Sequence, residues 1–395
     1  MNQSDQPDDI KILVPEHRRE AIRADLLSRR QALAVGAGGA LSLFLAACGG
    51  SSGQKAASTA TATSGLKDKP IEDRLLIGNW ADYVDPVDVK AFERATKAKV
   101  TIEGFGSTNE LIAKMKGGAE YDIAVPSQQG LPQMIEQGIV RPLDHSLLPN
   151  LANLEDAFKQ TSYDPGNKYS ITKDWGMTSF YWDPDVVTES PKSLMEAFDL
   201  IPKYKGKRIN FVDADADVIP AALVALGLDI NSEDEADYKQ ALALLMKVKP
   251  AISTFNSSVV DKMSQGRIDF GLGWNGDAAR ARKELAKKGK KIEFLIPETD
   301  GIYWTDNWVI GASGKSPVAA HRWLNTMLDP KVAATEMAYC GYGVPVKGIE
   351  EHADKAVLDD PYVNVPADTI KTYKTAGNSR VITKLRLDYY GKLKA

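Results

Sequence analysis

The segment GIYWTDNW, residues 301–308, places three aromatic side chains and one carboxylate within six consecutive residues. Side chains alternate between the two faces of a β-strand, so Trp304 and Asp306 would share one face while Tyr303 and Thr305 occupy the other. An aromatic ring beside a carboxylate suits an organic cation, because the ring covers methylene groups and the carboxylate pairs with an ammonium. The alternative is an ordinary core strand whose aspartate caps a turn.

The same combination of aromatic rings and a carboxylate recurs far upstream, in the segment NWADYV at residues 79–84. It follows an apolar run, residues 74–78, that is typical of a short buried strand. Ser127 follows another predicted strand at residues 121–125 in the same way. Ligands of parallel α/β sheets bind beyond the carboxyl ends of the strands, so these positions are candidates for a binding site.

Strands and helices alternate along the chain after residue 74. We expect strands at residues 74–78, 99–104, 121–125, 175–182, 208–211, 268–274, 291–295 and 307–310, and helices at residues 86–97, 218–226, 233–246, 259–265, 277–288, 317–328, 331–338 and in the last stretch to residue 390. Ser107 and Glu110 form a capping-box pattern at the start of one further helix. This alternation predicts an α/β fold with a mainly parallel sheet and helices on both faces.

The length and composition are those of a globular protein. The chain has 395 residues, enough for about two domains, with 43% hydrophobic and 26% charged residues. Its net charge of −4 argues against a nucleic-acid partner, which normally needs a basic surface. The four histidines show no metal-ligand spacing and no nucleophile–base motif is present. We therefore expect no metal, no cofactor and no enzymatic activity.

Residues 1–47 are predicted to be an export signal. Arg29 and Arg30 precede an apolar run of about 14 residues, which is shorter than the ~20 residues of a membrane-spanning helix. The paired arginines resemble a twin-arginine signal, with the general secretory pathway as the alternative route.

The end of this apolar run, LAAC at residues 45–48, resembles the lipobox of bacterial lipoproteins. Cleavage before Cys48 would leave its thiol to carry the lipid, and the alternative is that Cys48 ends an uncleaved anchor. The following Gly-, Ser-, Ala- and Thr-rich stretch predicts a flexible linker over residues 48–70, with a reach of roughly 25 Å. We expect an extracytoplasmic protein, lipid-anchored to the outer face of the membrane. Cys340, the second of two cysteines, would then have no disulfide partner.

Five motifs follow one another in order between about Leu75 and the C-terminus. They are NWADYV at 79–84, YDIAVPS at 121–127, WNG at 274–276, GIYWTD at 301–306 and GYGVP at 341–345. With this set the chain resembles the spermidine/putrescine-binding proteins of bacterial ABC importers. The resemblance implies a periplasmic-binding-protein fold, in which two α/β lobes joined by crossing strands close over a ligand. We expect lobe 1 at residues 71–178 and 306–350, and lobe 2 at residues 179–305 and 351–395.

The resemblance also implies the residues of the site. They are five aromatic, three acidic and two polar positions: Trp80, Tyr83, Trp274, Trp304 and Tyr342; Asp82, Asp217 and Asp306; Ser127 and Gln129. The chain departs from the family pattern at Gln129, where the family has a tyrosine, and at Ala81, which replaces a threonine. It departs again at Ala214, where the family has an acid. These departures bear on which amine binds and how long it is, more than on whether the ligand is a polyamine.

A polyamine needs such a site for physical reasons. Each buried ammonium must be paired, or its desolvation would cost several kcal/mol, while each methylene gains about 0.8 kcal/mol on leaving water. Spaced carboxylates with aromatic walls between them meet both demands. The resemblance further implies delivery to a membrane permease driven by a separate ATPase, and we expect a monomer. For Trp182, Trp308 and Trp323, by contrast, core packing is the expectation.

A rival interpretation rests on the segment GLGWNG at residues 271–276, which matches the dinucleotide-binding fingerprint between a predicted strand and a predicted helix. Glu293 lies near the position of a ribose-binding acid, so the chain could be an exported NAD-dependent oxidoreductase. Asp277 argues against this, because it puts a negative charge at the helix N-terminus where a pyrophosphate would bind.

Other ligands and chemistries also remain open. Aromatic plates stack on sugars, so a binding protein for a sugar, an amino acid or another cationic amine is an alternative, and Asp82 with Asp306 could be a glycosidase pair. The run DADAD at residues 213–217 begins like a calcium loop, but Val218 and Val224 occupy positions that need Gly and Glu. If extended, this run would put its three aspartates on one face, which would suit an amine. The alternative is a solvated cluster at a helix start.

Overall fold

The computed structural model describes residues 65–365, 372–377 and 379–395 of the chain. The predicted export signal, Cys48 and the linker as far as residue 64 lie outside the described residues. In these ranges, no helix combines the length and the apolar character that crossing a membrane requires.

A ten-stranded sheet runs through the described part of the chain in the order β2-β1-β3-β12-β7-β10-β8-β9, with β4 beside β12 and β11 beside β7. Its strands are β1 (Arg74–Asn79), β2 (Lys99–Gly104), β3 (Ile123–Ala124), β4 (Val140–Arg141), β7 (Ser170–Trp182), β8 (Ile209–Phe211), β9 (Thr254–Phe255), β10 (Phe270–Trp274), β11 (Glu293–Phe294) and β12 (Ile302–Gly311). A separate hairpin joins β5 (Gln160–Thr161) to β6 (Asp164–Pro165).

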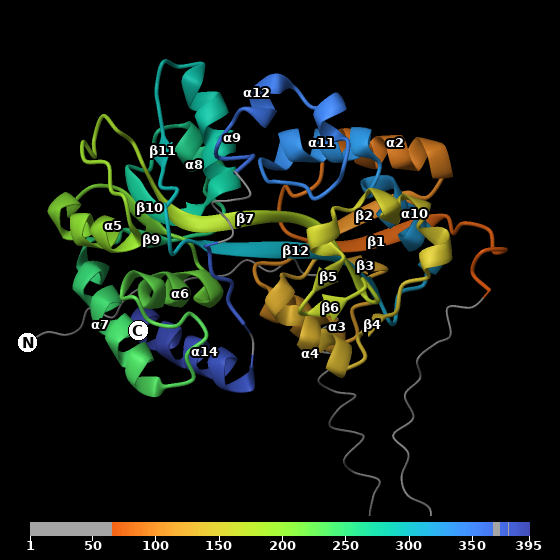
Figure 1. Ribbon diagram of the computed structural model, residues 1–395, viewed down its shortest axis with the longest axis horizontal. Helices are drawn as coiled ribbons and strands as arrows, with labels where there is room; N and C mark the ends of the chain where they lie inside the picture. Colours follow the sequence, from red (N-terminus) through yellow and green to blue (C-terminus); the bar gives the residue numbers. More distant parts are fainter. Residues whose placement is uncertain (1–64, 366–371, 378) are drawn as a thin grey trace, which may run out of the picture. The chain divides into compact units, whose positions relative to one another are not determined.

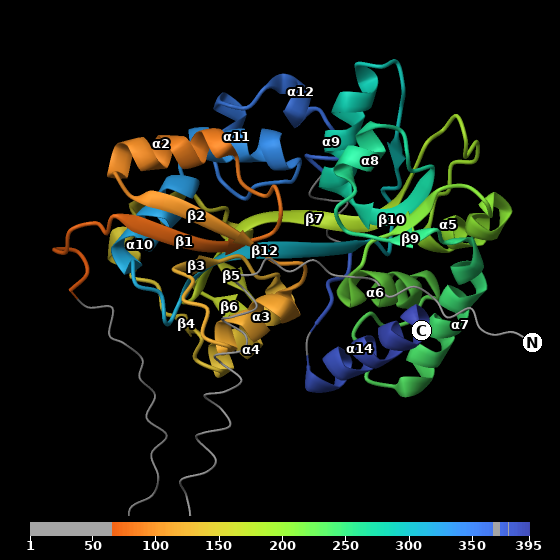
Figure 2. The ribbon, with the colours of Figure 1, turned by 180° about the vertical axis from the view of Figure 1, so that it is seen from behind.

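Two long strands, β7 and β12, connect the two ends of this sheet. They pair antiparallel, from Thr178 opposite Ile302 to Ser170 opposite Val309. Figures 1 and 2 show them running through the middle of the sheet, with β1, β2 and β3 at one end and β9 and β10 at the other. The pairs β1–β2, β1–β3, β8–β9 and β8–β10 are all parallel. The predicted arrangement of two mainly parallel halves joined by crossing strands is therefore confirmed.

Helices cover both faces of each half. They are α2 (Pro86–Thr96), α3 (Thr108–Lys116), α4 (Leu131–Glu136), α5 (Leu194–Leu200), α6 (Asp215–Ala225), α7 (Glu235–Val248), α8 (Val260–Ser264), α9 (Asn275–Ala286), α10 (Pro317–Met327), α11 (Pro330–Cys340), α12 (Lys355–Leu358) and α14 (Arg380–Lys394). We call the half with β1–β4, α2–α4, α10 and α11 lobe 1, and the half with β8–β11, α5–α9 and α14 lobe 2 (Figure 1). The predicted boundaries at residues 178 and 306 fall inside the two crossing strands.

Local sequence signals explain the element starts that position the site. Ser107 caps α3, because its hydroxyl accepts a hydrogen bond from the backbone N–H of Glu110 at 3.1 Å, as the capping-box pattern predicts. The strand expected at residues 175–182 is longer than predicted and begins at Ser170. Polar residues such as Lys173 interrupt the apolar pattern there, yet every residue of β7 is buried. Neither α5 nor the short helix α4 was expected from the sequence.

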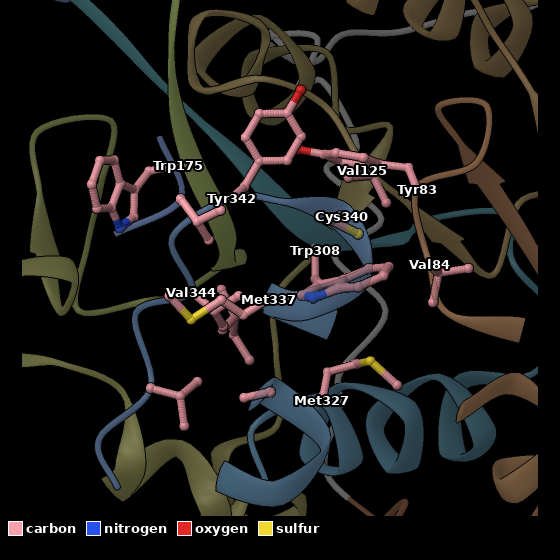
Figure 3. Packing of buried hydrophobic residues seen from close by; sticks show 14 of the residues in the cluster. Tyr83, Val84, Val125, Trp175, Trp308, Met327, Met337, Cys340, Tyr342 and Val344 are labelled. Atoms are coloured by element: carbon pink, nitrogen blue, oxygen red, sulfur yellow. The ribbon is translucent and has the colours of Figure 1, made fainter. Parts of the chain in front are cut away.

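The three tryptophans assigned to the core are indeed buried, with exposed fractions of 5% for Trp182, 3% for Trp308 and 0% for Trp323. Figure 3 shows Trp308 beside Met337 and Cys340, beneath the rings of Tyr83 and Tyr342. The same cluster of apolar side chains continues from lobe 1 across β7 to α9 in lobe 2. Apolar packing therefore continues between the lobes.

Candidate ligand-binding site

A cavity of about 240 Å³ is lined by residues from both lobes and from β12. All ten side chains that the sequence implied as ligand-binding line this one cavity: Trp80, Asp82, Tyr83, Ser127, Gln129, Asp217, Trp274, Trp304, Asp306 and Tyr342. Lobe 1 contributes the loops after β1, β3 and α11, and lobe 2 contributes the start of α6 and the junction of β10 with α9. The structure therefore brings the predicted set together, and the binding role of each residue remains a prediction.

Strand β12 forms the floor of the cavity. Trp304 and Asp306 line it from one face of β12, as the alternation predicted, and Thr305 lines a separate cavity on the other face. Tyr303, which was also expected on that other face, lines both cavities. Trp304 lies opposite Gly176 of β7, where a Cβ atom would meet the indole ring at 2.5 Å. Glycine is needed there so that the ring can lie across the strand. The ring of Tyr342 contacts the indole edge-on, with centroids 5.1 Å apart.

Asp306 is a buried carboxylate with a fixed orientation, 4% exposed. The hydroxyl of Ser127 donates a hydrogen bond to its Oδ1 at 2.6 Å. Asp174 is its cross-strand neighbour on β7. Burial, followed by the negative charge of Asp174, raises the pKa of Asp306 to about 7, and the hydrogen bond from Ser127 opposes this shift. An ammonium bound in the cavity would stabilise the charged form of Asp306 and so offset the cost of burying that charge beside Asp174.

A buried ion pair lies beneath the cavity, and sequence reasoning missed it. The ammonium of Lys173 is 2.6 Å from Asp174 and 3.8 Å from Glu336 of α11, and it lies 3.9 Å from the centre of the Tyr83 ring. Tyr83 donates a hydrogen bond of 2.6 Å to the other oxygen of Asp174. The network therefore holds one aromatic wall of the cavity against the crossing strand. In the sequence, the sign of this ion pair is the adjacent Lys173 and Asp174 inside a strand.

The lobe 1 wall is built on the loop after β1. The indole N–H of Trp80 donates to the carbonyl of Val125 at 2.9 Å, and its ring packs against Phe105 with centroids 4.7 Å apart. These contacts hold Trp80 in one orientation. Asp82 is exposed, and its φ of 53° is in the left-handed region that an aspartate tolerates better than most residues. Its carboxylate is thus at the edge of the cavity rather than in its floor.

On the lobe 2 side, Asp217 occupies the first turn of α6. Its Oδ1 accepts hydrogen bonds from the indole N–H of Trp274 at 3.1 Å and from the hydroxyl of Thr178. Burial raises the pKa of Asp217 to about 6, although both hydrogen bonds favour the charged form. The ring-and-carboxylate pairing of Trp304 with Asp306 therefore has a counterpart here.

The suggestion that residues 213–217 form an extended acidic face is wrong. Helix α6 begins at Asp215, which leaves Asp215 and Asp217 at the cavity. Asp213 is exposed and accepts hydrogen bonds from Tyr390 at 2.6 Å and from Lys394 at 2.9 Å. The contacts with α14 hold Asp213 away from the cavity, whose lining does not include it.

The glycines of the segment 271–276 have structural roles that differ from those in a dinucleotide-binding turn. A Cβ at Gly271 would meet the carbonyl oxygen of Asn210 at 2.2 Å, and a Cβ at Gly276 would meet the ring of Tyr342 at 2.3 Å. These glycines thus admit a neighbouring strand and a cavity side chain. Asp277, in the first turn of α9, is 8% exposed, where a pyrophosphate would have to bind. Among the described residues, no group of His, Cys, Asp and Glu side chains could hold a metal ion.

Two α/β lobes on crossing strands, with a cavity of rings and carboxylates shared between them, define a binding protein for a small solute. The family described as "Bacterial extracellular solute-binding protein" matches residues 89–364. The chain belongs to this family, and it is extracytoplasmic.

Individual relatives and a solved structure are similar to this chain over most of its length. The spermidine/putrescine-binding periplasmic protein of Escherichia coli strain K12 is 32% identical over 322 residues, which are 80% of this chain and 90% of that protein. The putrescine/agmatine-binding protein of Pseudomonas aeruginosa is 30% identical, covering 74% of this chain and 84% of its own length. Among solved structures, the spermidine/putrescine ABC transporter substrate-binding protein PotD of Streptococcus pneumoniae matches with a TM-score of 0.68 at 28% identity, over 82% of this chain and 99% of that one.

The raised pKa of Asp306 predicts opposite pH dependences for binding and for stability. A bound ammonium favours the carboxylate form, so affinity for an organic cation should fall by up to about tenfold per unit as the pH drops below 7. Without ligand, folding raises this pKa above its usual value of about 4, so the stabilising contribution of Asp306 is full below that value and is lost as the pH rises through 7. Titration calorimetry and urea unfolding between about pH 5 and pH 8 measure the two trends. An affinity that does not change with pH would contradict the assignment.

Proposed function

We propose that this protein binds a polyamine of the putrescine or spermidine kind between its lobes and delivers it to a membrane permease driven by a separate ATPase. The observation that carries the proposal is the pairing of a carboxylate with aromatic rings on both sides of one cavity. Asp306 lies beside Trp304 and Tyr342 on the floor, and Asp217 is bonded to Trp274 on lobe 2.

The chemistry of the cavity supports a cation with an apolar middle. Burial raises the pKa of both carboxylates, so the charged form of each would gain from an ammonium. The rings between them can cover methylene groups and add roughly 0.5–2 kcal/mol per well-placed cation–π contact. Relatives with 30–32% identity that are named for putrescine, spermidine or agmatine binding support the same class.

Binding should draw the lobes together. The carboxylates and rings are divided between the lobes, so a ligand that touches both sets favours the closed arrangement by its higher affinity for it. The crossing strands β7 and β12 are the connection about which such a motion would occur. Small-angle scattering should record a smaller radius of gyration with a saturating diamine than without it. Unchanged dimensions despite demonstrated binding would contradict closure.

A thermal-shift screen tests the ligand class. A ligand that binds the folded state alone stabilises it by about 2.7 kcal/mol at a hundred times its Kd. Putrescine and spermidine should raise the melting temperature, whereas maltose, arginine and γ-aminobutyrate at equal concentration should raise it less. Stabilisation by the sugar alone would mean that the fold is right and the ligand class is wrong.

We propose further that the mature protein is a lipoprotein anchored at Cys48. The proposal rests on the LAAC segment at the end of the apolar run and on the linker that follows it. Cys48→Ser removes the sulfur that would carry the lipid, so the precursor should remain uncleaved. Intact mass and partition into detergent compare the two proteins, and equal values for the wild type and the variant would rule out lipidation.

A further inference from the structure

The C-terminal helix α14 places a buried guanidinium at the lobe 2 end of the cavity. Arg386 lines the cavity and is 3% exposed. Within the described residues its Nε and Nη1 atoms have no hydrogen-bond partner. Its ion-pair partner is Asp215, with Nε and Oδ2 3.9 Å apart, and that oxygen also lacks a hydrogen bond. The two groups are thus close enough to offset each other's charge but too far apart to be hydrogen-bonded.

Among the described residues, the buried and half-buried charges at this end of the cavity nearly cancel. Lobe 2 contributes three buried or half-buried carboxylates to the lining, Asp215, Asp217 and Asp277, and two arginines, Arg280 and Arg386. Asp215 interacts with Arg386 and Asp277 with Arg280. Asp217 accepts its hydrogen bonds from the neutral donors Thr178 and Trp274, and the charge of Arg386 favours its carboxylate form less than these hydrogen bonds do. Among these buried and half-buried groups of the described residues, one net negative charge therefore remains, and Asp217 carries it. Asp261 of α8 also lines the cavity, but it is exposed and screened by water.

We infer that Arg386 is a specificity-determining residue that limits the lobe 2 end of the cavity to one ammonium group, so that the protein prefers a linear diamine to a triamine. The inference rests on the proposed polyamine function. With Asp306 buried at the floor and Asp217 half-buried at the lobe 2 end, the cavity presents two carboxylates that form no ion pair within the described residues. A third ammonium would need Asp215, whose charge Arg386 already offsets, and it would lie close to the guanidinium itself.

The expected change in the preference between diamine and triamine follows from the charge of the Arg386 guanidinium. Two like charges about 5 Å apart at an effective dielectric constant of 20 repel strongly enough to change an equilibrium constant by roughly three hundredfold. Asp215 offsets part of this repulsion. Loss of the guanidinium should therefore shift the preference toward the triamine by at least about tenfold.

The experiment measures the Kd values of putrescine and spermidine for the full chain by calorimetry and compares their ratio among variants. Arg386→Met should improve spermidine relative to putrescine by at least about tenfold. Arg386→Lys keeps the charge and should keep the wild-type ratio. The double variant Arg386→Met with Asp215→Asn also removes the carboxylate that the single variant leaves unpaired. Its ratio of putrescine to spermidine Kd values should therefore return toward that of the wild type.

Each failure has a distinct meaning. If folded Arg386→Met keeps the wild-type ratio, the inference is overturned while the polyamine function stands. If Arg386→Met does not fold, Asp215→Asn decides: it leaves the guanidinium uncompensated and should weaken spermidine more than putrescine, and an unchanged ratio overturns the inference. If the wild type binds neither amine, the proposed function fails and this inference with it.

Discussion

Replacing Asp306 by Asn should weaken polyamine binding by roughly thirtyfold to several-thousandfold, the equivalent of about 2–5 kcal/mol for a desolvated charge pair that loses one partner. Asn keeps the shape and retains an oxygen that can accept the hydrogen bond from Ser127. The same change removes a buried negative charge that lies beside Asp174. The ligand-free variant should therefore be at least as stable as the wild type at pH 8. Calorimetric titration and urea unfolding measure the two effects.

Asp261 provides a matched control for this variant. It also lines the cavity, but it is an exposed carboxylate on α8, so Asp261→Asn should change the affinity much less, because an exposed charge is screened by water. Equal losses in both variants would mean that the overall negative field, and not a specific pair, holds the ligand. Wild-type affinity in folded Asp306→Asn would mean that the ligand binds elsewhere.

Replacing Lys173 by Met should destabilise the ligand-free protein by about 3–5 kcal/mol, the usual effect of removing one partner of a buried ion pair. Lys173 is 3% exposed in its side chain, and Asp174 is fully buried. Burial alone would lower the pKa of Lys173, but the nearby acidic groups, Asp174 first among them, outweigh burial and raise it. Methionine fills similar space but leaves Asp174 without its positive partner. Denaturant unfolding at neutral pH measures the loss.

Two further variants show whether the charge or the packing is responsible. Lys287 pairs with Glu284 on the surface at 2.7 Å, with both side chains largely exposed, so Lys287→Met should change stability by less than about 1 kcal/mol. Adding Asp174→Asn to Lys173→Met removes the unpaired charge and leaves an oxygen for Tyr83, so it should recover part of the loss. If Lys173→Met unfolds like the surface variant, the buried pair does not stabilise the fold.

The alternation of apolar segments allowed the fold class to be predicted, because strands and helices impose short periods that are visible locally. The placement of Trp304 and Asp306 on one strand face follows from the same period of two, and the structure bears it out. Ser107 and Glu110 likewise interact over three residues, so their capping contact was predictable from the sequence. The sequence motifs also indicated which side chains follow strand ends and therefore meet at one edge of the sheet.

Contacts between distant segments could not be predicted in this way. Tyr83 and Asp174 are 91 residues apart in sequence, and Asp213 and Tyr390 are 177 apart. Nothing local distinguishes Asp213, which is bound by α14, from Asp217, which lines the cavity. In the sequence, Arg386 is one charged residue among several in a C-terminal helix, and no local feature marks it as part of a site. Tertiary packing places it in the cavity lining next to Asp215.

The sequence by itself thus determined the α/β class, the faces of the strands and the kinds of side chain that gather at the cavity. These properties depend on neighbours a few residues away. Only the tertiary structure decided the raised pKa of Asp306, the buried pair of Lys173 with Asp174 and the position of Arg386. The reason is that electrostatic energies depend on distance and on burial, and both are set where β7, β12 and α14 bring remote parts of the chain together.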